Sequence, residues 1–163
     1  MKVYGVTGWK NAGKTGLMER LVTEITGRGF TVSTLKHAHH NVDVDQPGTD
    51  SYRHRVAGAS EVLLASGQRV AIMQELRGVP EPPLNELLER LSPVDLVLIE
   101  GFKSEAHPKV EAYRAEAANP LMAPENATIR AVASDTPLDV AVPVFDLNDT
   151  AAIADFILQE VGL

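Results

Sequence analysis

The sequence contains no cysteine, which excludes disulfide bonds, thiolate metal ligands and thiol nucleophiles. Aromatic residues make up only 5% of the chain, and Trp9 is the single tryptophan. No hydrophobic run is long enough to cross a bilayer. Met1 to Gly5 runs directly into a predicted strand, so we expect no signal peptide and a cytoplasmic protein without membrane partners.

Positive charge is also in short supply. The chain has 15 Lys and Arg residues against 22 Asp and Glu, giving a formal net charge of −7. This balance argues against nucleic acid as a partner, because nonspecific binding needs basic surface to neutralise phosphates. The cationic side chains that an anionic ligand requires are concentrated in the first quarter of the chain: Lys10, Lys14, Lys36, His37, His39 and His40.

Residues 8–15 read Gly-Trp-Lys-Asn-Ala-Gly-Lys-Thr, which fits the phosphate-binding P-loop pattern. Val3–Thr7 before it is short, apolar and partly β-branched, as in a strand. Leu17, Met18 and Leu21 behind it are spaced as in a helix. Pattern, strand and helix agree, so we predict a nucleotide-binding loop that opens a helix.

The predicted loop assigns chemistry to individual residues. Its glycines let backbone N–H groups turn toward phosphate oxygens, and the helix N-terminus adds further donors. Lys14 reaches the β and γ phosphates, and the Thr15 hydroxyl ligates Mg²⁺. Including other strand ends at the same edge of the sheet, we assign nucleotide binding to Gly8, Lys10, Asn11, Ala12, Gly13, Lys14, Thr15, Gly16, Lys36, His37, Gly101 and Asp135.

Strand and helix patterns alternate along the chain. We therefore predict one α/β domain over residues 1–163, a P-loop NTPase three-layer fold with a mostly parallel sheet and flanking helices. Residues 61–65 and 69–74 are predicted as a hairpin or as two edge strands. In such folds ligands bind at the carboxyl ends of the strands.

An acidic side chain near the phosphates is the next requirement. Glu100 ends a buried strand predicted over residues 94–99, and Gly101 lets backbone approach a ligand. We therefore expect Glu100 to hold Mg²⁺ or to orient water, and to be catalytic together with Lys14. The alternative is an ordinary strand-end carboxylate that pairs with Lys103.

The polar stretch from Lys36 to Asp50 allows three interpretations. Asp43 and Asp45 provide oxygen ligands that suit Mg²⁺. The histidines suit a transition metal such as Zn or Ni. The third interpretation is a solvated polar loop. We place Mg²⁺ first, which makes the predicted metal set Thr15, Asp43, Asp45 and Glu100.

Base recognition has a weak signature, because the chain has no Asn-Lys-x-Asp element. Ser134-Asp135 follows a late strand and occupies the equivalent position. Asp135 there can accept hydrogen bonds from guanine N1 and N2. A turn aspartate before Pro137 is the equally weighted alternative.

Taken together, the motifs resemble one family. The motifs that carry the resemblance are Gly8–Thr15, Lys36-His37-Ala38-His39-His40 with Asp43, Asp45, Pro47-Gly48 and Asp50-Ser51, then Ala57-Gly58-Ala59, Glu100-Gly101-Phe102-Lys103, and Pro108-Lys109-Val110-Glu111. From Val3 to about Asp135 the chain is similar to the molybdopterin-guanine dinucleotide biosynthesis protein B (MobB) family. The histidine loop followed by Glu-Gly-Phe-Lys is its most specific part.

The resemblance implies a homodimer that binds GTP with Mg²⁺ and hydrolyses it weakly. It also implies an adapter that works with a molybdopterin guanylyltransferase, near a molybdopterin-type cofactor, rather than the transferase itself. Gly13, Lys14, Thr15 and Glu100 take the family's nucleotide roles. Gly16 stands where the family often has a second Thr, and Ala12 replaces a common Ser.

Two other functions fit the same motifs. One is a small-molecule kinase or ATP-dependent ligase, in which Glu100 and the histidine loop hold a co-substrate. The other is a metal-delivery GTPase that uses His37, His39 and His40. Nucleotide preference distinguishes the first from a GTP-binding adapter, and stoichiometric Zn or Ni binding distinguishes the second.

Overall fold

The computed structural model describes residues 1–38 and 42–163. The chain divides into two compact units, Met1–His37 with Leu91–Leu163, and Ala38–Arg90. We call the first the sheet unit and the second the hairpin unit, and each is described by itself. The prediction of one domain over the whole chain stays a prediction.

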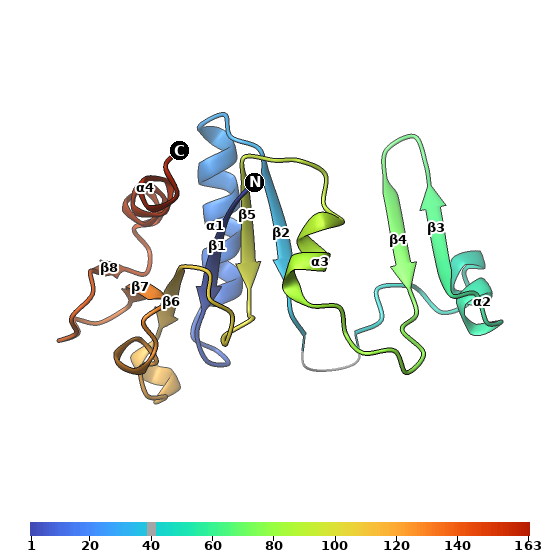
Figure 1. The fold of residues 1–163 in the computed structure, drawn as a ribbon. Coiled ribbons are helices and arrows are strands. Elements are labelled where there is room, and N and C mark those ends of the chain that lie inside the picture. The colour runs from blue at the N-terminus through green and yellow to red at the C-terminus, as the bar shows by residue number, and fades with distance from the viewer. Residues whose placement is uncertain (39–41) are drawn as a thin grey trace. The chain divides into compact units, whose positions relative to one another are not determined.

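The sheet unit is built on six strands, all paired in parallel in the order β2-β5-β1-β6-β7-β8 (Figure 1). Helices α1 and α4 and two 3-10 turns complete it. Its elements are β1 (Lys2–Thr7), α1 (Lys14–Gly27), β2 (Val32–Lys36), β5 (Leu96–Glu100), β6 (Lys109–Tyr113), η1 (Ala115–Ala117), η2 (Ala123–Glu125), β7 (Ile129–Ser134), β8 (Val144–Asp146) and α4 (Thr150–Val161).

The core of the sheet unit lies between one face of the sheet and helices α1 and α4. Alternate residues of each strand point to the same face, as Tyr4 with Val6 and Leu96 with Leu98 do. Leu17 and Leu21 of α1 and Ile153 and Ile157 of α4 cover them. This packing fixes the carboxyl ends of the strands, where the predicted site lies.

The opposite face of the same sheet buries polar residues. Lys109 and Glu111 of β6 are fully buried there. The Lys109 ammonium donates to the carbonyls of Glu105 and His107 and to Thr128 Oγ1. The Glu111 carboxylate accepts from the backbone N–H groups of Met122 and Ala123. Glu111 therefore holds the segment that connects β6 to β7, whereas Lys109 joins the end of that segment to the turn that precedes β6.

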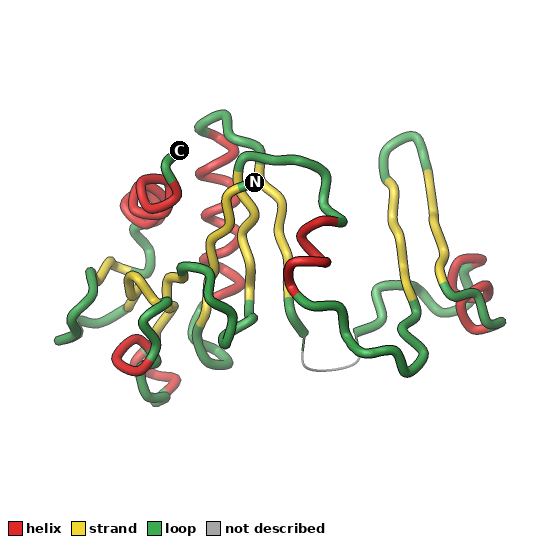
Figure 2. Tube along the Cα trace, viewed as in Figure 1, coloured by secondary structure: helices red, strands yellow, loops and turns green. Residues whose placement is uncertain are grey.

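The hairpin unit contains α2 (Asp50–Val56), β3 (Glu61–Ala65), β4 (Val70–Gln74) and α3 (Leu84–Glu89). Strands β3 and β4 pair antiparallel and form a separate two-stranded sheet, joined by a short turn (Figure 2). The sequence predicted either a hairpin or two edge strands, and the hairpin is confirmed. The short spacing between the strands favours pairing with each other.

The predicted fold class is confirmed, with a parallel sheet, flanking helices and a small antiparallel pair. No helix in the described parts of the chain has the length and apolar character that a membrane crossing requires.

Candidate nucleotide site

The Gly8–Thr15 loop connects β1 to α1, as its sequence predicted. Three of its residues have positive φ angles: Gly8 at 142°, Asn11 at 66° and Gly13 at 91°. A Cβ atom at Gly8 would lie 2.5 Å from the carbonyl oxygen of Ala112, so only glycine fits there. The backbone is therefore curled tightly against β6 before α1 begins.

The N-terminus of α1 is open toward this loop. Gly13 occupies the N-cap position, and no side chain caps the helix. The first N–H groups of any α-helix lack partners within the helix, and the helix dipole adds positive potential there. Asn11, Lys10 and Thr15 are exposed around the opening, whereas Ala12 is buried. The arrangement suits an anionic group.

Lys14 is surrounded by other charges. Its Nζ donates to the carbonyl oxygen of Trp9 at 2.6 Å. Burial lowers the pKa of the Lys14 ammonium, Glu100 opposes that effect, and Lys103 and Lys36 lower the pKa further. Three lysines and one glutamate thus converge on the loop. A bound polyphosphate would offset the repulsion among the three cations.

Glu100 lies at the carboxyl end of β5, between β1 and β2. It is in register with Val6 on one side and with Lys36 on the other. Its side chain is 12% exposed, and Oε1 lies 3.4 Å from Lys36 Nζ. The alternative partner considered from the sequence, Lys103, instead places its ammonium 4.1 Å from the centre of the Trp9 ring. Glu100 therefore reaches the predicted edge with Lys36 as its ion-pair partner.

The turn after Glu100 is conformationally unusual. Gly101 has a φ angle of 102° and Phe102 one of 47°. A Cβ atom at Gly101 would lie 3.0 Å from the His37 Cβ, so glycine is required by the protein itself. The His37 N–H donates to the Glu100 carbonyl at 2.9 Å, and its ring stacks on Phe102 with centroids 4.4 Å apart. A positive φ at a non-glycine residue stores strain of the kind that gathers at binding sites.

Asp43 and Asp45 belong to the hairpin unit, where both form ion pairs with Arg55. Arg55 Nη2 lies 2.7 Å from Asp43, Nε lies 3.3 Å from Asp45, and Nη1 lies 2.6 Å from Glu75. Asp45 also accepts from the Ser51 hydroxyl at 2.9 Å. Their role as Mg²⁺ ligands stays a prediction, and it would require Arg55 to release them. His39 and His40 lie outside the described residues.

The donor set for a metal ion is sparse. Within residues 1–38 and 42–163, no three His, Cys, Asp or Glu side chains form a group that could hold a metal. A Mg²⁺ ion that shares phosphate oxygens needs only one or two protein ligands. The Thr15 hydroxyl at the start of α1 and the Glu100 carboxylate at the end of β5 are oxygen donors of the right chemistry at the same edge.

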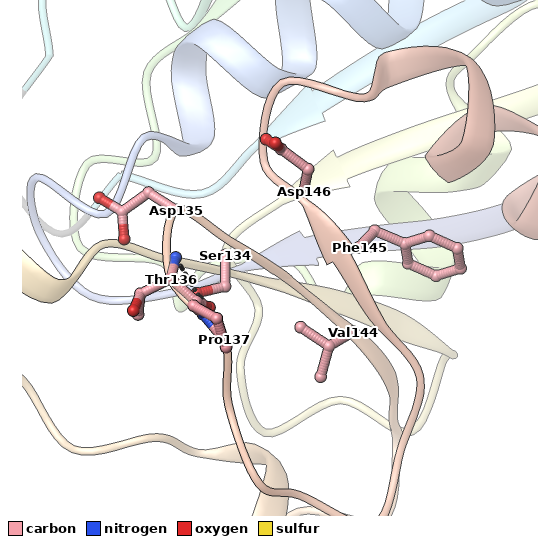
Figure 3. A pocket seen from close by; sticks show the side chains of 7 residues that line it. All are labelled: Ser134, Asp135, Thr136, Pro137, Val144, Phe145 and Asp146. Carbon is pink, nitrogen blue, oxygen red and sulfur yellow. Dashed lines mark hydrogen bonds between the residues drawn. The ribbon is translucent and has the colours of Figure 1, made fainter.

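Asp135 lies at the end of β7, where the sequence placed it. With Ser134, Thr136, Pro137 and residues 144–146 it lines a pocket of about 290 Å³. Figure 3 shows the Asp135 carboxylate and the Phe145 ring at opposite ends of this group. Asp135 Oδ1 accepts from the backbone N–H of Ala115 at 2.9 Å, so the carboxylate holds the turn after β6. Its contact with guanine stays a prediction.

The Gly8–Thr15 loop contacts residues 114–123, a connection that was not predicted from the sequence. The Trp9 indole N–H donates to the carbonyl of Pro120 at 2.7 Å. Arg114, directly after β6, lies beside Gly13. Residues 114–123 have no hydrophobic period, so their sequence carries no local signal for these contacts. The only available signal was their position after a strand next to β1, which depends on the strand order.

The family model for "Molybdopterin guanine dinucleotide synthesis protein B" (MobB) matches residues 3–135 of the chain. Two relatives carry the name "Molybdopterin-guanine dinucleotide biosynthesis adapter protein". The one from Haemophilus influenzae is 43% identical, over 95% of this chain and 86% of the relative. The one from Escherichia coli K12 is 41% identical, over 93% of this chain and 88% of the relative.

A solved structure agrees with these relatives. The crystal structure of a MobB protein homolog from Bacillus stearothermophilus superposes with a TM-score of 0.75 and 32% sequence identity, covering 99% of both chains. Sequence and fold are therefore shared along nearly the whole length. This chain belongs to the molybdopterin guanine dinucleotide synthesis protein B (MobB) family.

Proposed function

We propose that this protein is a GTP-binding adapter in the biosynthesis of molybdopterin guanine dinucleotide, with a weak Mg²⁺-dependent GTPase activity. The observation that carries the proposal is the group of cations around the Gly8–Thr15 loop, beside an uncapped helix N-terminus. Lys14 begins that helix, the Lys103 ammonium lies 4.1 Å from the Trp9 ring, and Lys36 pairs with Glu100 at the neighbouring strand end. Triphosphate is the ligand class whose charge matches three cations and an open helix end.

Hydrolysis would depend on positioning and electrostatics. Lys14 would stabilise charge on the phosphates, and Glu100 would orient water or hold Mg²⁺ with Thr15. Mg²⁺, when bound, would neutralise phosphate charge. Because the chain has no cysteine, catalysis through a thiol nucleophile is excluded. Slow transfer of the terminal phosphoryl group to water is the reaction that Lys14, Thr15 and Glu100 support best.

The adapter role rests on the family. The names of the Haemophilus influenzae and Escherichia coli relatives describe adapters in this biosynthesis. We propose a guanylyltransferase as the partner enzyme, with a molybdopterin-type cofactor held at or near the complex. Nucleotide binding would then control the complex rather than supply the transferred guanylyl group.

The hairpin unit supports a homodimer. Residues directly opposite in an antiparallel pair share a face, and Leu63 lies opposite Ile72 while Ala65 lies opposite Val70. Leu63, Val70 and Ile72 are each about 60% exposed, at 60%, 63% and 61%. An aliphatic strip of this kind, on a two-stranded sheet with open edges, is typical of an association surface. We propose a second copy of this chain as its cover.

Calorimetric titration of GTP and of ATP, each with and without Mg²⁺, tests the nucleotide part. We expect Mg²⁺-dependent GTP binding and weak ATP binding. The Lys14→Ala substitution should lower the affinity for GTP about 100-fold, because it removes the central positive charge of the site. Lys2→Ala is the matched control, since Lys2 lies at the amino end of β1.

Three outcomes would contradict the proposal. Unchanged GTP affinity in Lys14→Ala would exclude the loop as the phosphate site. ATP binding equal to or tighter than GTP binding would favour the kinase or ligase alternative. Release of guanylyl product by the protein alone would make it a transferase instead of an adapter.

A further inference from the structure

Arg114 directly follows β6, and its side chain lies against the Gly8–Thr15 loop. A Cβ atom at Gly13 would lie 2.9 Å from Arg114 Nε and 3.3 Å from Leu147 Cδ2. The guanidinium therefore lies against the residue that opens α1. The Arg114 backbone is extended, with φ −130° and ψ 129°, and Arg114 leads into the turn at Ala115–Ala117.

No other described group neutralises Arg114. Its side chain is exposed, and within residues 1–38 and 42–163 that side chain makes neither a hydrogen bond nor an ion pair. Arginines elsewhere in the sheet unit are engaged: Arg20 with Thr150, Arg28 with Asp155, and Arg130 with Glu160. Arg114 is thus a charge held beside the predicted phosphate site with its donors available.

The position of Arg114 is fixed from a third strand. Asp135, after β7, accepts from the Ala115 N–H at 2.9 Å and so holds the turn that follows Arg114. Asn11, Arg114, Glu116 and Ala117 line a pocket of about 360 Å³. Segments that follow β1, β6 and β7 therefore meet beside the loop, at the carboxyl edge of the sheet.

The strand order separates Arg114 from the Glu100–Lys36 pair. β5 and β2 lie on one side of β1, whereas β6 lies on the other. Glu100 and Lys36 mark the side suited to the terminal phosphate and its metal. A nucleotide whose polyphosphate follows the loop would then extend its nucleoside end toward β6, where Arg114 lies.

We propose that Arg114 binds the nucleotide at its α-phosphate and ribose, and that Asp135 positions Arg114 through the Ala115 turn. This inference rests on the proposed function, because it needs a nucleotide in the Gly8–Thr15 loop. Gly16, in the first turn of α1, has no side chain to offer there, and a guanidinium suits phosphate oxygens through paired donors. Asp135 acts here on the protein backbone rather than on guanine.

The test is calorimetric titration of GTP and GDP on Arg114→Gln. Because both nucleotides carry an α-phosphate, we expect both affinities to fall about tenfold or more, by a similar factor. Arg114→Lys should recover part of the loss. Asp135→Ala should lower the affinities for GTP and ATP by a similar factor. If Asp135 instead contacted guanine, the substitution would lower the affinity for GTP alone. Arg130→Gln removes the same charge at a distance and should bind as the wild type does.

The results distinguish failure of this inference from failure of the proposed function. Wild-type affinities in Arg114→Gln, with binding still lost in Lys14→Ala, would overturn this inference and leave the proposed function intact. A loss confined to GTP would overturn the α-phosphate placement. Absence of nucleotide binding by the wild-type protein would overturn the proposed function and this inference together. Unchanged melting temperatures would show that the variants remain folded.

Discussion

The sheet unit and the hairpin unit are stabilised in different ways. In the sheet unit a continuous apolar core joins α1, α4 and alternate residues of the parallel strands. In the hairpin unit, the buried hydrophobic side chains among the described residues are Val62 and Leu84. Its best-connected side chain is charged, since Arg55 contacts Asp43, Asp45 and Glu75.

The two units therefore differ in where their stability comes from. The sheet unit can hold the Gly8–Thr15 loop rigidly without outside help, because burial of its core supplies the stability. The hairpin unit buries little of its own apolar surface, and its two-stranded sheet is too small to be stable alone. Its order must come from the ion cluster around Arg55 and from whatever covers the strip of Leu63, Val70 and Ile72.

The largest effect is expected in the core of the sheet unit. Leu98→Ala removes a fully buried side chain from the central strand β5 and should lower the free energy of unfolding by about 2–5 kcal/mol. Urea denaturation of the wild type and the variant measures this. Leu64→Ala in the hairpin unit is the matched control. It should lower the free energy of unfolding by about 0.5 kcal/mol or less, because Leu64 is 54% exposed. Equal losses would remove the contrast between the units.

Breaking the ion cluster should affect the hairpin unit alone. Arg55→Gln leaves Asp43, Asp45 and Glu75 without their common cation, and the Arg55 side chain is only 14% exposed. Hydrogen exchange in residues 42–90 should accelerate about tenfold or more, while exchange in α1 stays unchanged. Arg69→Gln, on the turn between β3 and β4, provides the control. Faster exchange in α1 as well would show that the units are coupled.

The apolar strip should govern self-association. Leu63→Lys with Ile72→Lys places two like charges at opposed positions of one face, and should weaken the dimer about tenfold or more. Sedimentation velocity over a concentration series measures this, and nucleotide affinity serves as the check on folding. Leu64→Lys, on the other face of β3, should associate as the wild type does. If Leu64→Lys has the larger effect, the second copy packs on that face instead.

The smallest effect concerns His107, whose two ring nitrogens are buried without a hydrogen-bond partner within residues 1–38 and 42–163. Burial, with a smaller contribution from Lys109, lowers the pKa of His107 to about 4. The unfolded chain therefore takes up this proton first as the solution is acidified. Stability that is complete above pH 6.5 should be lost as the pH falls toward 4.

Because the group is only partly buried, we expect His107 to account for about 1 kcal/mol over that range. Urea denaturation at several pH values, for the wild type and for His107→Gln, isolates the contribution. The carboxylates that also titrate are common to both proteins and cancel in the difference. Parallel stability curves for the two proteins would contradict the assignment.

The elements that could be predicted from the sequence were those with local signals. The Gly8–Thr15 loop has its own pattern, and the flanking strand and helix have clear periods, so β1 and α1 were placed correctly. Glu100 reached the expected edge because a buried strand of known direction precedes it. In all three cases the information lies within about ten residues.

What the sequence could not provide was the order of the strands. Glu100 pairs with Lys36 because β2 and β5 are neighbours in register, whereas the sequence suggested Lys103 as the alternative partner. Arg114 was overlooked for the same reason, since its contact with Gly13 exists only because β6 adjoins β1. The Arg55 cluster joins residues from three separate stretches of the chain and has no local signature.

The bond between the Trp9 indole and the Pro120 carbonyl makes the molecule its own optical probe. Trp9 is the sole tryptophan, it lies in the Gly8–Thr15 loop, and the Lys103 ammonium sits over its ring. Emission from this one fluorophore therefore responds to charge arriving in the loop and to any movement of the segment after β6. Nucleotide binding in the loop and movement of the segment after β6 can therefore be followed by intrinsic fluorescence, without an attached dye.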